Sequence, residues 1–279
     1  METINGDVMK WRFIETGFND AATNMAIDEA ILTCHGRGKV PPTLRFYRWR
    51  PPAISLGYFQ RLEKEVNAGL CRELGIQVVR RLTGGRAVLH DRELTYSVVV
   101  SESHPLMPAT VTESYKVISG GLLAGLKRLG ICAAIAPRNR SRSGELSPAA
   151  CFNTLSSYEL TVNGKKIAGS AQVRRQGVIL QHGSLPWELD ADKLFLVLKF
   201  SGRQAADRMK QAFLAKATCM RAVTERDIPW AEISAALREG FKSALGVELE
   251  TGRLTAEETR LALELVTLKY KSQEWNNKY

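Results

Sequence analysis

Cysteine is the residue type best suited to covalent chemistry in this chain, and Cys151 has the most suitable surroundings. It follows a polar loop over residues 138–148 and precedes a predicted hairpin, a place where a side chain can be presented to a cleft. Its thiolate form would be a nucleophile. A cysteine is more often a small buried hydrophobe, and we expect this of the other four, at positions 34, 71, 132 and 219.

The stretch RRLTGGRAVLHD at residues 80–91 is a candidate ligand-binding loop. Gly84 and Gly85 would let the backbone approach a ligand closely, because no Cβ stands in the way. The stretch lacks the GxxxxGK[ST] spacing of a phosphate-binding loop and the GxGxxG spacing of a dinucleotide site. The apolar residues after the glycines favour an apolar ligand. A tight glycine turn between two strands is the alternative.

Two adjacent lysines follow the strongest hairpin signal in the chain, Asn163-Gly164. A two-residue turn there places Lys165 opposite Val162 and Lys166 opposite Thr161. Because side chains alternate along a strand, one lysine points to solvent and the other can point into the covered face of the sheet. The small residues at 168–171 that follow could line a channel. Two solvated edge lysines are the alternative.

The rest of the chain predicts mixed helices and strands. Apolar periodicity, caps and β-branched runs predict these elements: helices over 21–32, 63–74, 110–129, 190–200, 230–245 and 256–270, and strands over 44–49, 53–57, 77–79, 93–100, 156–162, 165–173 and 177–185. This order favours an α+β fold, a mixed and mainly antiparallel sheet flanked by helices with a helical C-terminal tail. We expect one catalytic domain over residues 1–279, with a core at about 38–248 and a helical extension at 249–279.

Composition narrows the class of protein further. The 279 residues carry a net charge of +10, and 44% of them are hydrophobic, enough for a sizeable core. The five cysteines form no CxxC pair, which favours a reducing cytoplasm. No apolar run approaches the roughly 18 residues of a membrane span. No nucleic-acid-binding motif accompanies the basic charge, so acidic protein partners are favoured over nucleic acid or a membrane.

These motifs together resemble a known family. The chain is similar to the cysteine-dependent octanoyltransferases, the LipM type of the biotin/lipoate protein ligase superfamily. The matching stretches span nearly the whole chain in order: NMAIDEA (24–30), RFY (45–47), SLGYFQ (55–60), RRLTGGRAVLHD (80–91), LTYS (94–97), ATVTESYKVISGGL (109–122), CF (151–152), KKIAGSAQVRRQGVILQHGSL (165–185) and EWN (274–276).

The resemblance implies a role for each matching residue. Cys151 matches the acyl-carrying nucleophile, and Lys166 matches the lysine that lowers the pKa of the thiol. The stretch at residues 80–91, called the glycine loop from here on, matches the wall of the acyl pocket. Two later stretches, residues 169–171 and 183–185, match further parts of this wall. The implied acyl-binding residues are Arg81, Gly84, Gly85, His90, Gly169, Ser170, Ala171, Gly183 and Ser184.

The resemblance also implies the reaction and its partners. Octanoyl-acyl carrier protein would be the donor, and a lipoyl-domain protein such as glycine cleavage H protein the acceptor. No cofactor or metal is expected, since transfer from a thioester to an amine needs no activating nucleotide. Arg86 stands where ATP-using lipoate ligases carry a third glycine, which favours a transferase. Three alternatives stay open: a lipoate–protein ligase, an amidotransferase between lipoyl domains, and a basic nucleic-acid-binding protein.

Overall fold

The computed structural model describes residues 8–136, 159–224 and 226–279. Within them, the strands are β1 (Lys10–Asn19), β2 (Thr43–Trp49), β3 (Ala53–Leu56), β4 (Gln77–Arg80), β5 (Val88–His90), β6 (Glu93–Ser101), β7 (Ala134–Ile135), β8 (Leu160–Val162), β9 (Lys165–Arg175), β10 (Val178–Pro186) and β11 (Glu248–Thr251). The helices are α1 (Ala21–Gly36), α2 (Leu62–Glu65), α3 (Ala68–Glu73), α4 (Val111–Arg128), α5 (Ala191–Val197), α6 (Arg203–Lys216), α7 (Met220–Thr224), α8 (Trp230–Leu245), α9 (Ala256–Leu265), the π-helix η2 (Val266–Tyr270) and α10 (Gln273–Asn276).

Two sheets organise the described part of the chain. The larger has eight strands in the order β11-β1-β2-β6-β10-β9-β8-β7, and the smaller has the order β4-β3-β5. In the larger sheet β1 pairs in parallel with β2 and with β11, while the other neighbours are antiparallel. This architecture is the predicted α+β fold with a mixed, mainly antiparallel sheet.

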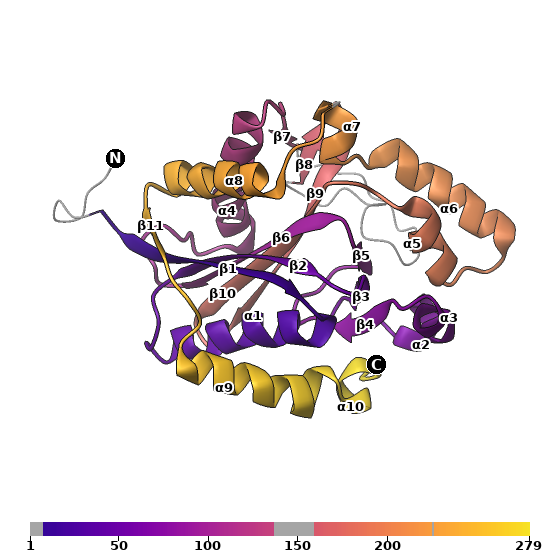
Figure 1. Cartoon of the computed structure of the whole chain (residues 1–279), viewed down its shortest axis with the longest axis horizontal. Helices are drawn as coiled ribbons and strands as arrows, with labels where there is room; N and C mark the ends of the chain where they lie inside the picture. Colours follow the sequence, from indigo (N-terminus) through magenta and orange to yellow (C-terminus); the bar gives the residue numbers. More distant parts are fainter. Residues whose placement is uncertain (1–7, 137–158, 225) are drawn as a thin grey trace.

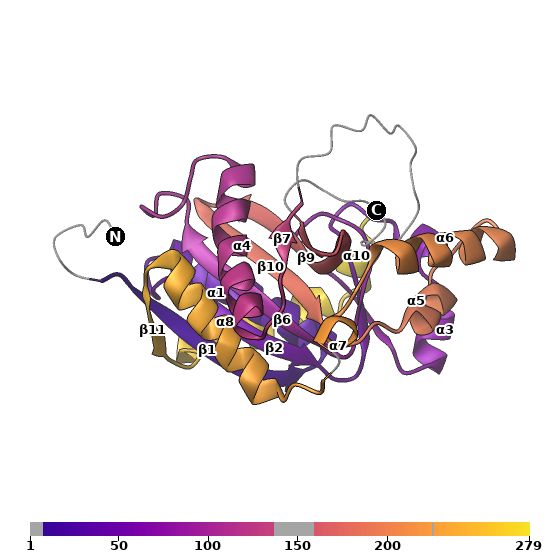
Figure 2. The ribbon, with the colours of Figure 1, turned by 90° about the horizontal axis from the view of Figure 1, so that it is seen from above.

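Helices cover both faces of the larger sheet (Figure 1). Helices α4 and α8 lie on one face, and α1 and α9 lie on the other, with the chain ending at α10 beside the smaller sheet. Seen from above, α5 and α6 lie beyond the end of the larger sheet (Figure 2). Asp20 begins α1 by accepting a hydrogen bond from the Thr23 amide at 2.7 Å, and Thr110 caps α4 in the same way.

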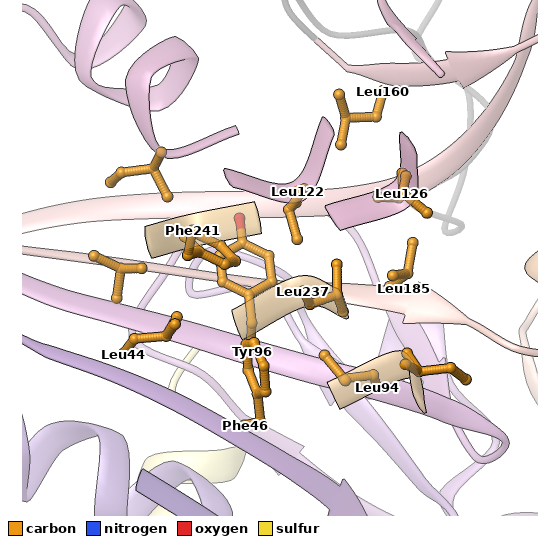
Figure 3. Packing of buried hydrophobic residues seen from close by; sticks show 14 of the residues in the cluster. Leu44, Phe46, Leu94, Tyr96, Leu122, Leu126, Leu160, Leu185, Leu237 and Phe241 are labelled. Carbon is orange, nitrogen blue, oxygen red and sulfur yellow. The ribbon is translucent and has the colours of Figure 1, made fainter. Parts of the chain in front are cut away.

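The main hydrophobic core fills the space between the larger sheet and helices α4 and α8. Phe46 of β2 and Tyr96 of β6 point toward Phe241 of α8, while Leu122 and Leu126 of α4 close the other side (Figure 3). A second buried cluster joins α1 and α9 to the opposite face of the sheet. A third packs the smaller sheet against α3, α5 and α6.

The hairpin of β8 and β9 has the predicted register. Thr161 pairs with Lys166 and Val162 pairs with Lys165, and the turn residues Asn163 and Gly164 have φ values of 51° and 75°. Positive φ at both positions is the geometry that Asn-Gly favours. The alternation is confirmed: Lys165 is exposed, and Lys166 is buried.

Several predicted boundaries were wrong. The helix expected over 63–74 is two short helices, because buried Val66 forms a bridge with Leu198 and Asn67 caps a new helix. The helix expected over 190–200 ends at Val197, from where the chain runs extended past Leu198.

The expected limits of the core were too narrow. They leave out β1, which is a strand of the larger sheet, and α1, which packs in the second hydrophobic cluster. The tail was expected to be helical from residue 249, but its first residues belong to β11. That all 279 residues form one catalytic domain stays a prediction.

Arg80 ties the C-terminal helix to the site region. Its buried guanidinium donates hydrogen bonds to the carbonyls of Gly57, Tyr58 and Gln60 and to those of Trp275 and Asn276. The end of the chain thereby supports the loop after β3, which packs against the glycine loop: a Cβ on Gly57 would lie 1.9 Å from the Gly85 carbonyl oxygen. Among the described residues, no helix has the length and apolar character needed to cross a membrane.

Candidate active site

A cavity lies where the two sheets meet. Its walls come from α1, β2, β3, β6, β9, β10 and the glycine loop, and the residues lining it are Met25, Tyr47, Trp49, Ser55, Arg81, Gly85, Val88, His90, Thr95, Gly169, Ser170, Ala171, His182, Gly183 and Ser184.

The cavity gathers nearly all the predicted acyl-binding residues, although they come from segments about 100 positions apart. Eight of the nine line it: Arg81, Gly85, His90, Gly169, Ser170, Ala171, Gly183 and Ser184. Gly84 is the exception. It lies in the loop behind the wall, where its carbonyl accepts a hydrogen bond of 2.8 Å from Arg81.

Arg81 shapes the glycine loop from within. One terminal nitrogen of its guanidinium donates to the carbonyls of Gly84 and Arg86 at 2.8 Å, and the other donates to the carbonyl and hydroxyl of Ser55. Gly85 has a φ of 97°, which favours glycine, and an added Cβ would lie 2.9 Å from the Arg81 guanidinium. The arginine therefore holds the loop in the conformation that closes the cavity.

A first chain of hydrogen bonds runs from Arg81 through His90. The Ser55 hydroxyl accepts from Arg81 at 3.1 Å and lies 2.7 Å from His90 Nε2, while His90 Nδ1 lies 2.7 Å from a Glu93 oxygen. Both ring nitrogens of His90 are thereby hydrogen-bonded, one to the hydroxyl and one to the carboxylate. His90 also stacks on Trp49 at 4.1 Å. The chain fixes the orientation of the ring in the wall of the cavity.

A second chain mirrors the first through His182. Thr83 Oγ1 accepts from Arg81 Nε at 3.1 Å and lies 2.7 Å from His182 Nε2, and His182 Nδ1 lies 3.3 Å from an Asp28 oxygen. Burial lowers the pKa of His182 below its ordinary value of 6.5, although Asp28 opposes the shift. Asp28 also pairs with Arg45 at 2.6 Å. A neutral imidazole of His182 therefore faces the cavity.

Lys166 lies on β9, three residues before the cavity wall begins at Gly169. Its side chain is 1% exposed, and its ammonium forms an ion pair with Glu159 of the same hairpin. Its carbonyl accepts a hydrogen bond of 2.8 Å from the Thr218 amide, and its strand forms a bridge with Ala217, where α6 ends. Lys166 is thus a buried cation at the end of the cavity wall.

Cys151 lies outside the described residues, so its role stays a prediction. Of the other cysteines, Cys34, Cys71 and Cys219 are buried as expected, but Cys132 is exposed, and that expectation was wrong. Cys132 follows buried Ile131 after the end of α4, so its side chain points outward. No group of acidic, histidine and cysteine side chains in the described ranges has the arrangement of a metal site.

Comparison with known proteins identifies the family. The family model of the lipoyl protein ligase A/B catalytic domain matches residues 20–242. The chain belongs to this family. It is 50% identical over 272 residues to Octanoyltransferase LipM of Geobacillus kaustophilus, covering 96% of this chain and 98% of that one. It is 52% identical to Octanoyltransferase LipM of Kyrpidia tusciae over 95% of this chain and 98% of that one.

A solved structure supports the same relationship. The bipartite lipoate protein ligase of Thermoplasma acidophilum superposes with a TM-score of 0.79 at 29% identity, covering 96% of both chains. The family, its fold and the class of enzyme, an acyltransferase, are thereby confirmed as predicted.

Several residues that line this cavity were not predicted from the sequence: Met25, Tyr47, Trp49, Ser55, Thr95 and His182. Asp28 and Glu159, the carboxylates that pair with His182 and Lys166, were not predicted either. A signal existed for Asp28, because a carboxylate in the largely apolar helix AATNMAIDEAIL must find a buried partner. No comparable signal existed for Glu159.

Gly183 offers a test of the cavity wall in this family member. A Cβ there would lie 2.4 Å from Ser170 Oγ and 2.7 Å from the Gly169 carbonyl oxygen. We expect Gly183→Ala to push β9 and β10 apart and to lower the free energy of unfolding by about 1–3 kcal/mol. Gly84→Ala is the matched control, because its Cβ meets nothing within 4 Å. Equal unfolding midpoints in urea for the two variants would contradict the close packing.

The buried imidazole of His182 makes the free energy of unfolding depend on pH. Below pH 6.5 the unfolded chain protonates His182 while the folded protein, whose pKa is lowered, does not. The unfolded state then binds more protons, so stability falls as the pH drops through 6.5. We expect His182→Gln to remove up to about 1 kcal/mol of the loss between about pH 7 and 5.5. The free energy of unfolding is measured by urea titration at each pH. If it falls equally with pH in the original protein and in His182→Gln, the expectation is refuted.

Proposed function

We propose that the protein transfers an octanoyl group from octanoyl-acyl carrier protein to a lysine of a lipoyl-domain protein, through a thioester on Cys151. The observation that carries the proposal is the identity of 50% with an octanoyltransferase over 96% of the chain. The cavity supports it, because eight residues expected to hold an acyl chain line one cavity.

The reaction has two half-reactions. The Cys151 thiolate attacks the donor's carbonyl carbon, a new C–S bond forms, and the carrier's thiolate leaves. The amine of the target lysine then attacks the octanoyl-enzyme, an amide bond forms, and the Cys151 thiolate leaves. A thioester is more reactive than an amide, so neither step requires a nucleotide.

Lys166 is proposed to manage the protons of both steps. As an ammonium near the thiol it would favour the thiolate, which is the reactive form. It would give a proton to the departing carrier thiolate and take one back from the incoming amine. Its burial and its ion pair with Glu159 support a fixed position for this group.

The cavity is proposed to hold the octanoyl tail. Tyr47, Trp49, Met25 and the small residues of β9 and β10 offer an apolar surface, and the histidines beside them are hydrogen-bonded on both ring nitrogens. Burying about seven apolar carbons would contribute about 5 kcal/mol, at about 0.8 kcal/mol for each methylene.

Two protein partners are proposed, the acyl carrier protein and a lipoyl-domain protein, with glycine cleavage H protein as the acceptor. The net charge of +10 supports association with acidic partners, at rates that fall as salt is added. We place the reaction in the cytoplasm, where the thiol of Cys151 would stay reduced.

Intact-mass spectrometry tests the covalent step. After mixing with octanoyl-acyl carrier protein, the protein should gain the mass of one octanoyl group, and neutral hydroxylamine should remove it, as it cleaves thioesters. Adding the lipoyl-domain acceptor should also remove it and move the mass to the acceptor. An unmodified protein under conditions where octanoyl transfer proceeds would refute the acyl-enzyme.

A lipoate–protein ligase is the second candidate, favoured by the structural likeness to the Thermoplasma ligase. It would need ATP and free lipoate or octanoate, and it would not need Cys151. An amidotransferase between lipoyl domains would also use Cys151, and its donor would be an octanoylated lipoyl domain. Assays with each of the three donors separate the candidates.

A further inference from the structure

A second hollow adjoins the acyl cavity. It is a groove of about 670 Å³ between the strand ends of β5, β6 and β10 on one side and α5 and α6 on the other. Val88 and Ser184 line both the groove and the cavity. The two hollows are therefore adjacent, and these two residues form part of the wall of each.

The meeting point lies close to the proposed proton donor. Ser184 pairs with Gly169 on β9, the strand that carries Lys166 three positions earlier. Helix α6, which supplies Phe213 and Leu214 to the groove, ends next to Lys166 through the bridge at Ala217. A thioester whose tail fills the cavity would have its sulfur near this point, and whatever the sulfur is attached to would enter the groove.

The groove is lined by both apolar and charged residues, and the charges are already paired. Its lining includes five carboxylates and three cations. Lys193 pairs with Asp91 and Asp190, Lys210 pairs with Asp192, and Arg92 pairs with Glu188. The fifth carboxylate, Glu93, accepts a hydrogen bond from Ser184.

This pairing decides the chemistry of the occupant. A triphosphate would meet more carboxylates than cations, and each of the cations already has a carboxylate partner. A neutral chain with amide groups needs no free cation, since it can pack its methylenes against the apolar side chains and hydrogen-bond to the polar ones.

We propose that the groove binds the pantetheine part, the neutral amide portion, of the phosphopantetheine arm by which the donor's octanoyl thioester is attached to its carrier. This inference rests on the proposed function and names the part of the donor that the site recognises beyond the acyl group.

Two inert ligands test this without any chemical step. S-octylpantetheine and S-octyl-N-acetylcysteamine are thioethers with the same tail, but the second ends after the first amide. By calorimetry on the full chain, we expect the longer arm to bind at least about tenfold more tightly, the effect of about two buried methylene groups. Equal affinities would overturn the proposal, whatever the variants do.

A matched pair of variants locates the effect. Leu214 lines the groove, and Leu196 lies on neighbouring α5 outside its lining; both are exposed. We expect Leu214→Trp to abolish the advantage of the longer arm and leave the affinity of the short ligand unchanged, and Leu196→Trp to change neither. An advantage that survives in Leu214→Trp, or ATP that displaces S-octylpantetheine at micromolar concentration, would count against the groove.

Failure of the proposed reaction gives a different pattern. The thioethers cannot transfer an acyl group, so their binding reports only the two hollows. If octanoylpantetheine gives no octanoylated acceptor while the arm effect persists, the reaction is wrong and the assignment of the groove stands. If transfer proceeds without an arm effect, the groove is wrong and the reaction stands.

Discussion

Replacing Cys151 by alanine is expected to lower the rate of octanoyl transfer from octanoyl-acyl carrier protein by at least about ten-thousandfold, the scale seen when a covalent nucleophile is removed. The acceptor amine would then have to attack the carrier's thioester directly. The acyl-enzyme divides the transfer into two thioester reactions, and the variant loses both. The measurement is the initial rate of octanoyl-acceptor formation.

Cys132→Ala is the matched control for this loss. Cys132 is exposed and follows α4, away from the residues that line the cavity, so its removal should leave the rate within about twofold. A Cys151→Ala protein that keeps its turnover, or that still joins free octanoate to the acceptor with ATP, would contradict the covalent route and favour the ligase.

Local rules predicted those parts of the fold that depend on neighbours in sequence. The Asn163-Gly164 turn determined which lysine is buried, because a two-residue turn fixes the pairing of the strands on both sides. Glycines and small residues in β9, β10 and the loop indicated a wall, and the structure brings them together around one cavity.

Distant pairing explains what local rules could not find. β1 carries Arg12, and a charged residue argues against a buried strand. Its partner Glu258 lies 246 positions away, at the start of α9, so the sequence around β1 does not show that the charge is paired. β11 has four residues and gains its order only as the parallel neighbour of β1. α6 buries only Phe213 and its sequence is mostly polar, so it has too few apolar residues to predict a packed helix.

The pairing of the buried polar residues in the site could not be predicted from the sequence for the same reason. His182 and Asp28 are 154 positions apart, and nothing in the sequence of either element indicates that the two side chains meet. Glu159 precedes a short strand, where a solvent-facing carboxylate is the ordinary expectation. Only the folded chain shows that it is 3% exposed and pairs with Lys166.

Substitutions in the ion pair of Lys166 and Glu159 give the second large prediction. They separate the role of Lys166 in the stability of the fold from its proposed role in the reaction. Lys166→Ala removes the ammonium from a buried carboxylate, and such a loss costs about 3–5 kcal/mol of unfolding free energy. The double variant Lys166→Met with Glu159→Gln replaces the ion pair by neutral groups of similar size. Its stability should lie within about 2 kcal/mol of the original protein.

Transfer should not recover with stability. If Lys166 moves protons and supports the thiolate, both variants should transfer octanoyl groups about a hundredfold to ten-thousandfold more slowly. Iodoacetamide should also alkylate Cys151 more slowly near neutral pH, since less of the thiol is ionised. Lys165→Ala is the control, because this exposed neighbour on the same hairpin should change neither stability nor rate. A double variant with restored stability and normal transfer would show that the buried lysine serves the fold alone.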